Sequence, residues 1–170
     1  MTSANDLLAL LRRDTESLES RFRAAEALFG SERDFPPDSL RATLASLYAE
    51  ALRRTGDGGR RWVPANAWGL LYDLNDAGPT GAHFVRLGDA AITELVKLLD
   101  DTGRLVYDGS KEATVGNAYG YRVKDAAAFY LGRILGVGVT FHQDVAERDA
   151  EIERLRRRAS ARHPVARDPH

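Results

Sequence analysis

The segment that decides the fold runs from Tyr121 to Leu135 and reads YRVKDAAAFYLGRIL. Its hydrophobic residues recur at the three- and four-residue spacing of an α-helix and cover one broad face. That face consists of Val123, Ala126, Ala127, Tyr130, Leu131, Ile134 and Leu135, and Ala128 and Phe129 add apolar surface beside it. We therefore expect one helix over this segment, and we expect it to be the most buried element of the protein.

The same periodicity continues in both directions along the chain, whereas the two-residue alternation of a half-buried strand is almost absent. Helices are expected over residues 3–29, from residue 38 or 39 to about 56, from Pro64 toward the Gly78-Pro79 break, over about 90–99 and from Asp144 onward, with a brief turn or helix over 80–87. The last helix has only a narrow apolar edge, which is formed by Val145, Ile152 and Leu155. The sequence thus predicts an all-α fold.

Length and composition are those of one ordinary folded domain. The chain has 170 residues, of which 44% are hydrophobic and 29% are charged, a balance far from that of disordered chains. We expect a single domain over residues 1–158 and a frayed tail over 159–170, where arginine, histidine and two prolines are mixed. The formal net charge of −1 gives the molecule no overall attraction to nucleic acid or anionic lipid.

The chain contains no cysteine. This excludes disulfides, thiolate nucleophiles and cysteine-ligated metal centres, and it agrees with a reducing compartment. The longest mostly apolar stretch, 126–139, is interrupted by Arg133 and is shorter than the ~20 residues that a membrane-spanning helix needs. Near the start, Asp6 precedes a short apolar run and Arg12-Arg13 follows it, which is the reverse of a signal peptide. We expect a cytoplasmic protein without a membrane segment.

Residues that carry enzyme chemistry are scattered. The histidines at positions 83, 142, 163 and 170 do not have the spacing of metal ligands, and His83 is expected to be a partly buried helix-end residue. No Gly-x-Ser-x-Gly motif marks a nucleophile, and Gly109-Ser110-Lys111 lacks the first glycine of a phosphate-binding loop because Arg104 stands there. We therefore expect no metal, no cofactor and no catalytic residues.

Two segments together resemble one known family. The segment 91–101, AITELVKLLDD, followed by 123–132, VKDAAAFYLG, resembles a HEAT-type repeat, in which two antiparallel helices pack closely. Asp101 matches the aspartate after the first helix, Lys124 replaces an arginine, and Leu131-Gly132 matches the end of the second helix. The resemblance covers about a fifth of the chain. It implies antiparallel helix pairs stacked as a short HEAT-like α-solenoid or helical array, a fold commonly used to bind other proteins.

The chain departs from that family between the two helices. Family members have a turn of a few residues there, whereas this chain has an insertion over 102–120, and connections of that length in a compact domain are usually functional or disordered. We interpret the insertion as an ordered element that faces a partner. Tyr107, Tyr119 and Tyr121 would be amphipathic anchors, and Asp108 and Asn117 would supply hydrogen bonds. The alternative is a packed lid that only covers the helix pair.

A second candidate surface is an arginine-rich loop. Arg53 and Arg54 precede a glycine-rich turn, and Arg60, Arg61 and Trp62 follow it, a combination that can hold phosphate or stack on a base. Against this, arginine outnumbers lysine by 21 to 3 in the whole chain, so arginine-rich surface reflects general usage. We place Arg60, Arg61 and Trp62 among the partner-binding residues and do not favour nucleic acid as the partner.

Three functions follow from these observations, in order of preference. The first is a non-catalytic protein–protein interaction module, a HEAT-like scaffold or adaptor. The second is a small regulatory or immunity-type protein that occludes one enzyme or toxin. The third is a nucleic-acid-binding helical repeat, and a metal-free enzyme comes last. The sequence leaves the identity of the partner, the pathway and the oligomeric state open.

Overall fold

The computed structural model describes residues 2–56, 60–71 and 76–162. Within these ranges every regular element is helical and strands are absent, which confirms the predicted all-α fold. None of the helices in these ranges combines the length and the hydropathy needed to cross a bilayer. The elements are α1 (Ala4–Arg12), α2 (Leu18–Ser31), α3 (Asp38–Gly56), the 3₁₀ helix η1 (Ala65–Trp68), α4 (Pro79–Arg86), the 3₁₀ helix η2 (Gly88–Ala91), α5 (Ile92–Leu98), α6 (Ser110–Tyr119), α7 (Val123–Leu135) and α8 (Val145–Arg162).

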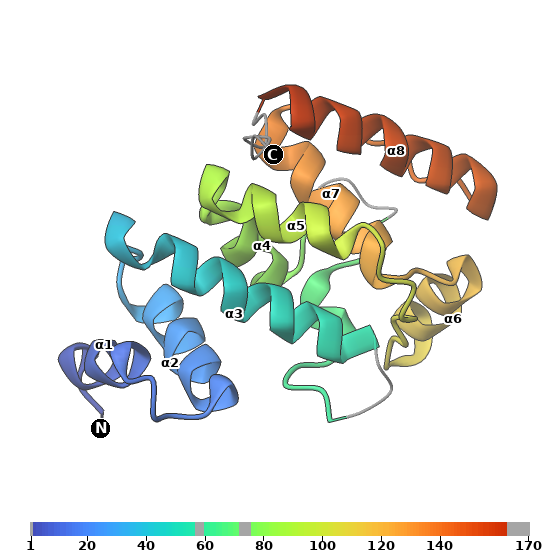
Figure 1. Cartoon of the computed structure of the whole chain (residues 1–170). Coiled ribbons are helices and arrows are strands. Elements are labelled where there is room, and N and C mark those ends of the chain that lie inside the picture. The colour runs from blue at the N-terminus through green and yellow to red at the C-terminus, as the bar shows by residue number, and fades with distance from the viewer. Residues whose placement is uncertain (1, 57–59, 72–75, 163–170) are drawn as a thin grey trace.

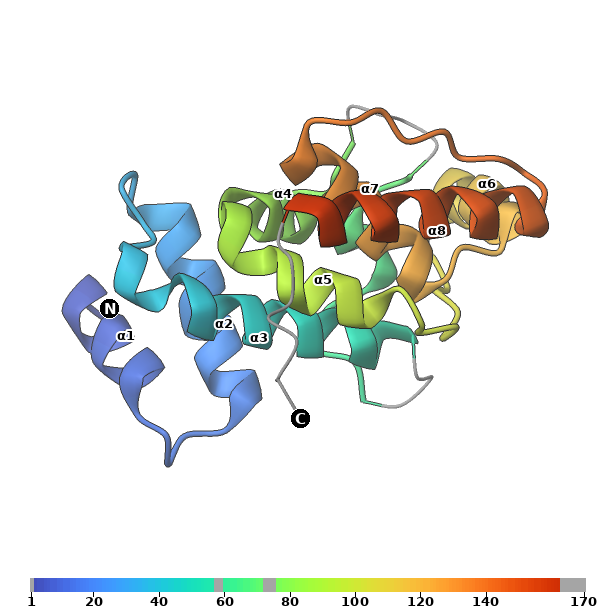
Figure 2. The same ribbon diagram turned by 45° about the horizontal axis from the view of Figure 1, so that its top comes forward.

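The helices are arranged so that six of them follow one another in space as they do in sequence (Figure 1). In that series α1 packs on α2, α2 on α3, α3 on α5, α5 on α7, and α7 on α8. Helix α4 and η1 lie against α7 outside the series (Figure 2). Helix α7 contacts α3, α4, α5 and α8, and nine of its thirteen residues are buried. It is the most buried helix, as its sequence predicted.

The first predicted helix is divided in two. Residues 13–17 leave the helical path, and the hydroxyl of Ser17 accepts a hydrogen bond from the Ser20 amide at 3.1 Å, which caps α2. Serine favours this cap over a position inside a helix because its side chain competes for backbone groups. Thr15, which a continuous helix would place on the apolar seam, is exposed. Helix α1 folds back on α2 and buries Leu11.

The helix predicted from Pro64 is only one 3₁₀ turn, η1. Gly69 ends it with φ 78°, a conformation that favours glycine. The backbone at Gly69 then passes so close to Gly78 that a Cβ on either residue would overlap the other segment. Leu74, which we expected to lie on this helix, is outside the described residues. A backbone crossing of this kind has no periodic signal, so hydrophobic spacing alone overestimated the helix.

Tyr130 of α7 joins this crossing to the core. Its hydroxyl donates a hydrogen bond to the carbonyl oxygen of Trp68 and lies 3.4 Å from that of Ala77. The indole of Trp68 is itself buried, and its Nε1 donates to Thr55 Oγ1 at 3.0 Å. Helix α4 approaches so closely that a methyl group at Gly81 would overlap the phenol oxygen of Tyr130. One tyrosine therefore holds η1, the start of α4 and α7 together.

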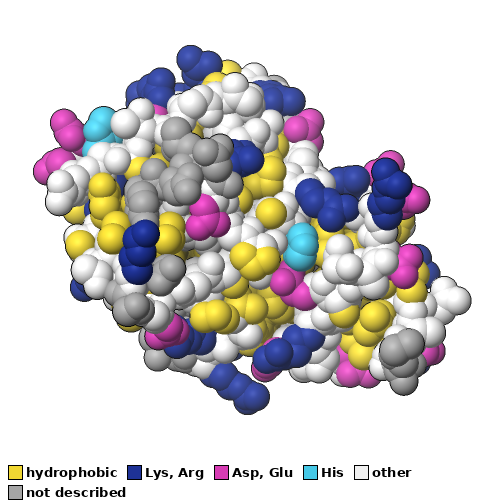
Figure 3. Space-filling model, turned by 180° about the vertical axis from the view of Figure 1, so that it is seen from behind, with side chains coloured by type: hydrophobic (Ala, Val, Ile, Leu, Met, Phe, Trp, Pro, Cys, Tyr) yellow, Lys and Arg dark blue, Asp and Glu magenta, His cyan; other side chains and the backbone are white. Residues whose placement is uncertain are grey.

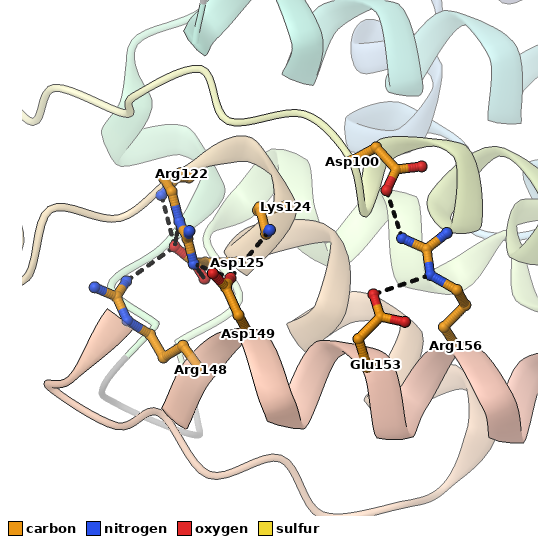
Figure 4. Close-up of polar contacts among 8 residues, drawn as sticks. All are labelled: Asp100, Arg122, Lys124, Asp125, Arg148, Asp149, Glu153 and Arg156. Atoms are coloured by element: carbon orange, nitrogen blue, oxygen red, sulfur yellow. Dashed lines mark hydrogen bonds and ion pairs between the residues drawn. The ribbon is translucent and has the colours of Figure 1, made fainter. Parts of the chain in front are cut away.

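Helix α8 is held by a charged contact where an apolar one was expected. Arg148 and Asp125 are 2% and 1% exposed, and Arg148 Nη1 lies 2.9 Å from Asp125 Oδ2 (Figure 4). Arg122 donates two further hydrogen bonds to the same carboxylate, at 2.9 and 3.0 Å. Val145, which we placed on the apolar edge, is 48% exposed. Arg148 instead shares the inner face of α8 with Ile152 and Leu155.

The same helix extends farther than predicted. Helix α8 continues to Arg162, so residues 159–162 belong to it rather than to a frayed tail. Ala159 is buried in the core, and Arg162 lies 3.5 Å from Asp89. These contacts hold the last turn in place, and they were hidden from the composition-based prediction. The rest of the predicted tail, 163–170, is outside the described residues.

Removing the Tyr130 side chain should destabilise the protein strongly. Tyr130→Ala deletes a buried ring and leaves the Trp68 carbonyl without its donor, so we expect the free energy of unfolding to fall by about 3 kcal/mol or more. Tyr130→Phe keeps the ring and should cost about 1 kcal/mol. Denaturant titration measures both values. Equal midpoints for Tyr130→Ala and the unaltered protein would contradict this account of the core.

The buried charge on α8 gives a second prediction. Arg148→Ala leaves the Asp125 carboxylate with fewer cationic partners in a buried position, so we expect a loss of about 3 kcal/mol. Arg158→Ala, an exposed change on the same helix, should cost less than about 0.5 kcal/mol. Chemical unfolding of the two variants side by side measures the difference. If they unfold together, the Arg148–Asp125 pair does not hold α8.

Candidate functional site

The two candidate surfaces, the arginine loop and the insertion, are in contact in the folded protein. Arg61 and Asp108, which join them, are 47 residues apart in sequence. Arg61 Nη2 lies 3.0 Å from Asp108 Oδ2, so a residue of the arginine loop pairs with a residue of the insertion. Asn66 strengthens the junction from η1, because its Nδ2 donates to the Asp108 carbonyl at 2.8 Å and its Oδ1 accepts from the Asp108 amide at 2.9 Å. Two regions that the sequence analysis treated separately thus form one surface.

The two ends of the insertion, residues 101–104 and 122–124, lie side by side and are hydrogen-bonded to each other. We call this paired region the neck. Backbone amides on its return side donate across the neck, from Val123 to the Gly103 carbonyl at 2.8 Å and from Lys124 to the Asp101 carbonyl at 2.9 Å. Arg104 and Arg122 form an isolated antiparallel bridge at the same place. The neck crosses the C-terminal end of α3 where Gly56 and Gly103 face each other, a contact in which a Cβ would clash. Beyond the neck the chain forms α6 and returns.

The three tyrosines of the predicted site point inward. Tyr107 and Tyr121 are buried in the core, and Tyr107 Oη donates to the Gly69 carbonyl at 2.9 Å. Burial raises the pKa of Tyr107 above its ordinary value. Tyr119 is half-buried and stacks on Tyr121 with ring centroids 5.2 Å apart. Their rings therefore fix the insertion to the helices, and the outward positions of the insertion belong to other residues.

Two of those outward residues lie next to each other. Val106 is 52% exposed, and the Asp108 side chain is exposed beside it. Asn117, by contrast, is used within the insertion, since it accepts from the Tyr107 amide at 2.9 Å and donates to the Tyr107 carbonyl at 3.2 Å. This pair of bonds keeps the Val106–Asp108 segment extended and in place. Of the predicted insertion residues, Asp108 alone therefore combines an exposed side chain with a contact to the arginine loop.

Trp62 and Arg60 are the sequence neighbours of Arg61 in the arginine loop. Trp62 is buried, with Phe22 at a ring-centroid distance of 5.6 Å and the Arg54 guanidinium 5.2 Å from its ring centre. The Arg60 side chain is 85% exposed, and its Nη2 lies 3.7 Å from Glu19 Oε2. The indole is thus part of the core, whereas the guanidinium beside it is on the surface.

An open cleft of about 580 Å³ lies beside Arg60 and Trp62, and we call it the arginine cleft. It runs between the N-terminal turn of α2 and the ends of the arginine loop. Its lining consists of Ser17, Leu18, Glu19, Ser20, Arg23, Arg54, Arg60 and Trp62. Three of these residues are cationic and one is anionic, so the cleft carries a net positive charge although the whole chain does not.

One polar cluster, which no sequence pattern indicated, lies between α2, α3 and α4. Glu26 of α2 accepts hydrogen bonds from Tyr48 Oη and, at 2.9 Å, from Thr80 Oγ1, and it lies 2.8 Å from His83 Nδ1. The His83 ring stacks on Phe29 with centroids 4.4 Å apart. On the back face of the molecule histidine side chains lie beside acidic ones (Figure 3), in agreement with the His83–Glu26 and His142–Glu147 contacts.

No spacing rule could have found this cluster, because Glu26 and His83 are 57 residues apart and come from different helices. His83 does lie in the last turn of α4 and is partly buried, as expected. Desolvation alone would raise the pKa of Glu26, but the hydrogen bonds from His83, Tyr48 and Thr80 together hold the pKa below its ordinary value. The ionised carboxylate is therefore a stabilising part of the α2–α3–α4 contact.

Comparison of the chain with protein-family models, with curated proteins and with solved structures found no match. Within residues 2–56, 60–71 and 76–162, histidine and acidic side chains form no group of three or more that would hold a metal ion. The proposed function therefore rests on the geometry of the described side chains. Two features stand out in it: the surface that joins the arginine loop to the insertion, and the Glu26 cluster beneath α4.

The Glu26 cluster predicts a dependence of stability on pH. Because the folded pKa of Glu26 is depressed, its stabilisation is complete above the ordinary value of 4.5 and is lost as the pH falls through the folded pKa. Glu26→Gln should lower the free energy of unfolding by about 1 kcal/mol or more at pH 7, and by less below pH ~4. Urea titrations of both proteins at several pH values measure this. A difference that does not shrink in acid would contradict the assignment.

Proposed function

We propose that the protein is a non-catalytic interaction module, an adaptor or scaffold that binds another protein in the cytoplasm. One observation carries the proposal. Arg60 and Arg61 are consecutive, yet Arg60 reaches Glu19 on α2 while Arg61 reaches Asp108 on the insertion. They join two parts of the surface into one strip, and each end of the strip exposes a large apolar side chain: Leu18 is 44% exposed and Val106 is 52% exposed.

The strip combines charge with exposed apolar surface. Arginine is enriched in protein interfaces and among their hot-spot residues, and Leu18 and Val106 offer apolar area that a partner can bury. The strip is also ordered before binding, because Asn117 and Asn66 fix the backbone at Tyr107 and Asp108, directly after Val106. Binding of a partner would therefore cost this protein little conformational entropy.

The helical scaffold is part of the same proposal. We infer that the series α1, α2, α3, α5, α7 and α8 is a short HEAT-like array, with α5 and α7 as the helix pair whose residues resemble the repeat. Support comes from the order of packing, in which each helix of the series contacts the next. In such an array every helix except the first and the last is held on two sides, and a binding strip on its rim keeps its shape.

An immunity-type or regulatory protein that occludes a single enzyme or toxin would use the same strip, and a tight one-to-one complex would identify it. A nucleic-acid-binding repeat is less well supported. A base stacks on an exposed aromatic face, whereas Trp62 is buried under Arg54 and against Phe22.

Affinity capture from the cells that make the protein tests the proposal. We expect the tagged protein to retain at least one partner that Val106→Asp fails to retain, because an unpaired charge would enter the apolar contact at the Val106 end of the strip. Val145→Asp is the matched control, since Val145 is similarly exposed at 48% but lies on α8. Both variants should melt like the unaltered protein, because each change is on the surface.

Quantitative mass spectrometry of the three captures gives the answer. A partner that is retained with Val145→Asp and lost with Val106→Asp supports the strip as the binding surface. Three identical sets of captured proteins would overturn the proposal. Retention of nucleic acid alone, released steeply by salt, would replace it with the nucleic-acid alternative.

A further inference from the structure

We propose that the arginine cleft binds an acidic segment of the protein partner, with carboxylates of that segment replacing Glu19 as the counter-ions of Arg23 and Arg60. This inference rests on the proposed interaction function and adds the chemistry of what is bound. It is carried by the charge of the cleft, by its exposed apolar edge and by the position of Glu19.

The cationic groups of the cleft converge from two helices and a loop. Arg23 comes from α2, Arg54 comes from the end of α3, and Arg60 comes from the loop that follows. Arg54 is fixed by Glu50, whose Oε1 lies 2.6 Å from its Nε, and it covers the Trp62 ring. Arg23 and Arg60 have side chains that are mostly exposed. A ligand in the cleft therefore meets one positioned guanidinium and two that can adjust.

The apolar part of the cleft sets a second requirement. Leu18 is 44% exposed at the N-terminal turn of α2 and lines the cleft together with Trp62. A free anion such as phosphate would leave this surface exposed, whereas a peptide with a large apolar side chain among its carboxylates would cover it. Charge and hydrophobicity together thus favour an acidic peptide.

Glu19 occupies the position that we assign to the partner's carboxylate. Its Oε1 accepts from Arg23 Nη2 at 2.8 Å, and its Oε2 lies 3.7 Å from Arg60 Nη2. The hydrogen bond from Arg23 lowers the pKa of Glu19, so it is ionised at neutral pH. Exposed ion pairs of this kind contribute little and exchange readily. A partner carboxylate can therefore take over both arginines, and Glu19 acts as a built-in competitor.

Because Glu19 and the peptide compete for the same arginines, substitutions at neighbouring residues should change the affinity for an acidic peptide in opposite directions. Loss of Arg23 and Arg60 should weaken binding of an acidic peptide, and loss of the Glu19 charge should strengthen it. An unselective attraction to the protein surface would not depend on where the charge is changed. The matched controls are therefore equal charge changes on α8, which lies away from α2 in both views (Figures 1 and 2).

The probe is a fluorescein-labelled peptide with a leucine between glutamate pairs, and its lysine counterpart is the comparison. Fluorescence anisotropy with the full chain should show saturable binding of the glutamate peptide, weakened by added salt. Arg23→Gln with Arg60→Gln should weaken it about tenfold, and Glu19→Gln should strengthen it about threefold. Arg157→Gln with Arg158→Gln, and Glu153→Gln alone, are changes at exposed positions of α8 and should each change it by less than about twofold.

Other outcomes would overturn the inference. These are the absence of saturable binding, equal binding of the lysine peptide, or equal effects of the cleft and α8 variants. Tighter binding of a labelled DNA duplex that depends on the same arginines would assign the cleft to nucleic acid. Peptide-induced self-association, seen by light scattering, would assign it to a second copy of this chain. Circular dichroism of each variant shows that it is folded.

The inference and the proposed function can fail separately. If Val106→Asp abolishes capture of a partner but the glutamate peptide does not bind, the interaction function stands and the acidic segment is wrong. If the peptide binds as expected but no captured partner depends on Val106, the cleft is an acidic-peptide site and the wider strip is wrong. Neither result depends on knowing the partner in advance.

Discussion

A buried carboxylate that must be satisfied organises one half of the molecule. Asp125 sits in the first turn of α7 and binds Arg148 and Arg122 in a region that water does not reach. Removing charges from water is costly, so such a group is tolerated only with several well-placed partners. Arg148 also donates to the Tyr119 carbonyl at 2.7 Å. The position of α8 and the C-terminal end of α6 are therefore both set by the requirements of one side chain of α7.

The other half is organised by aromatic side chains with polar tips. Tyr130, Trp68 and Tyr107 each place a hydroxyl or indole N–H on a backbone carbonyl or threonine oxygen inside the core. Such groups fix direction as well as filling space. The segment around η1 is irregular and lacks the packing of a longer helix. These hydrogen bonds fix its position instead. Its rigidity is what allows Asn66 to position Asp108 for Arg61.

The sequence predicted the helices whose apolar faces are broad. The helix expected from residue 38 or 39 to about 56 is α3, and the segment 121–135 contains α7, because burial on one face leaves a periodic signal. The failures have local causes. Ser17 begins a new helix by capping it, and Arg148 is buried because it forms an ion pair. Helix α6 lacks an apolar stripe but lies against Tyr107, because Gly116 leaves room for the ring.

Of the candidate site, Arg60, Arg61 and Asp108 are on the surface, whereas Trp62, Tyr107 and Tyr121 are buried. A tyrosine or tryptophan has an apolar ring and one polar group, so it suits the surface and also a core in which that group is hydrogen-bonded. The sequence alone does not distinguish the two positions.

The closed neck of the insertion has a consequence for how this protein can change over time. The ends of the insertion are already joined by backbone hydrogen bonds and by the Arg104–Arg122 bridge, so the entropy of closing the loop is carried by the neck and depends only weakly on what lies beyond it. Lengthening or shortening the chain between residues 106 and 119 therefore leaves α5 and α7 in register, provided that the buried Tyr107 ring and Gly116, which makes room for it, are kept. The neck thus separates the helical scaffold from a tip whose length can change, as a framework is separated from a variable loop.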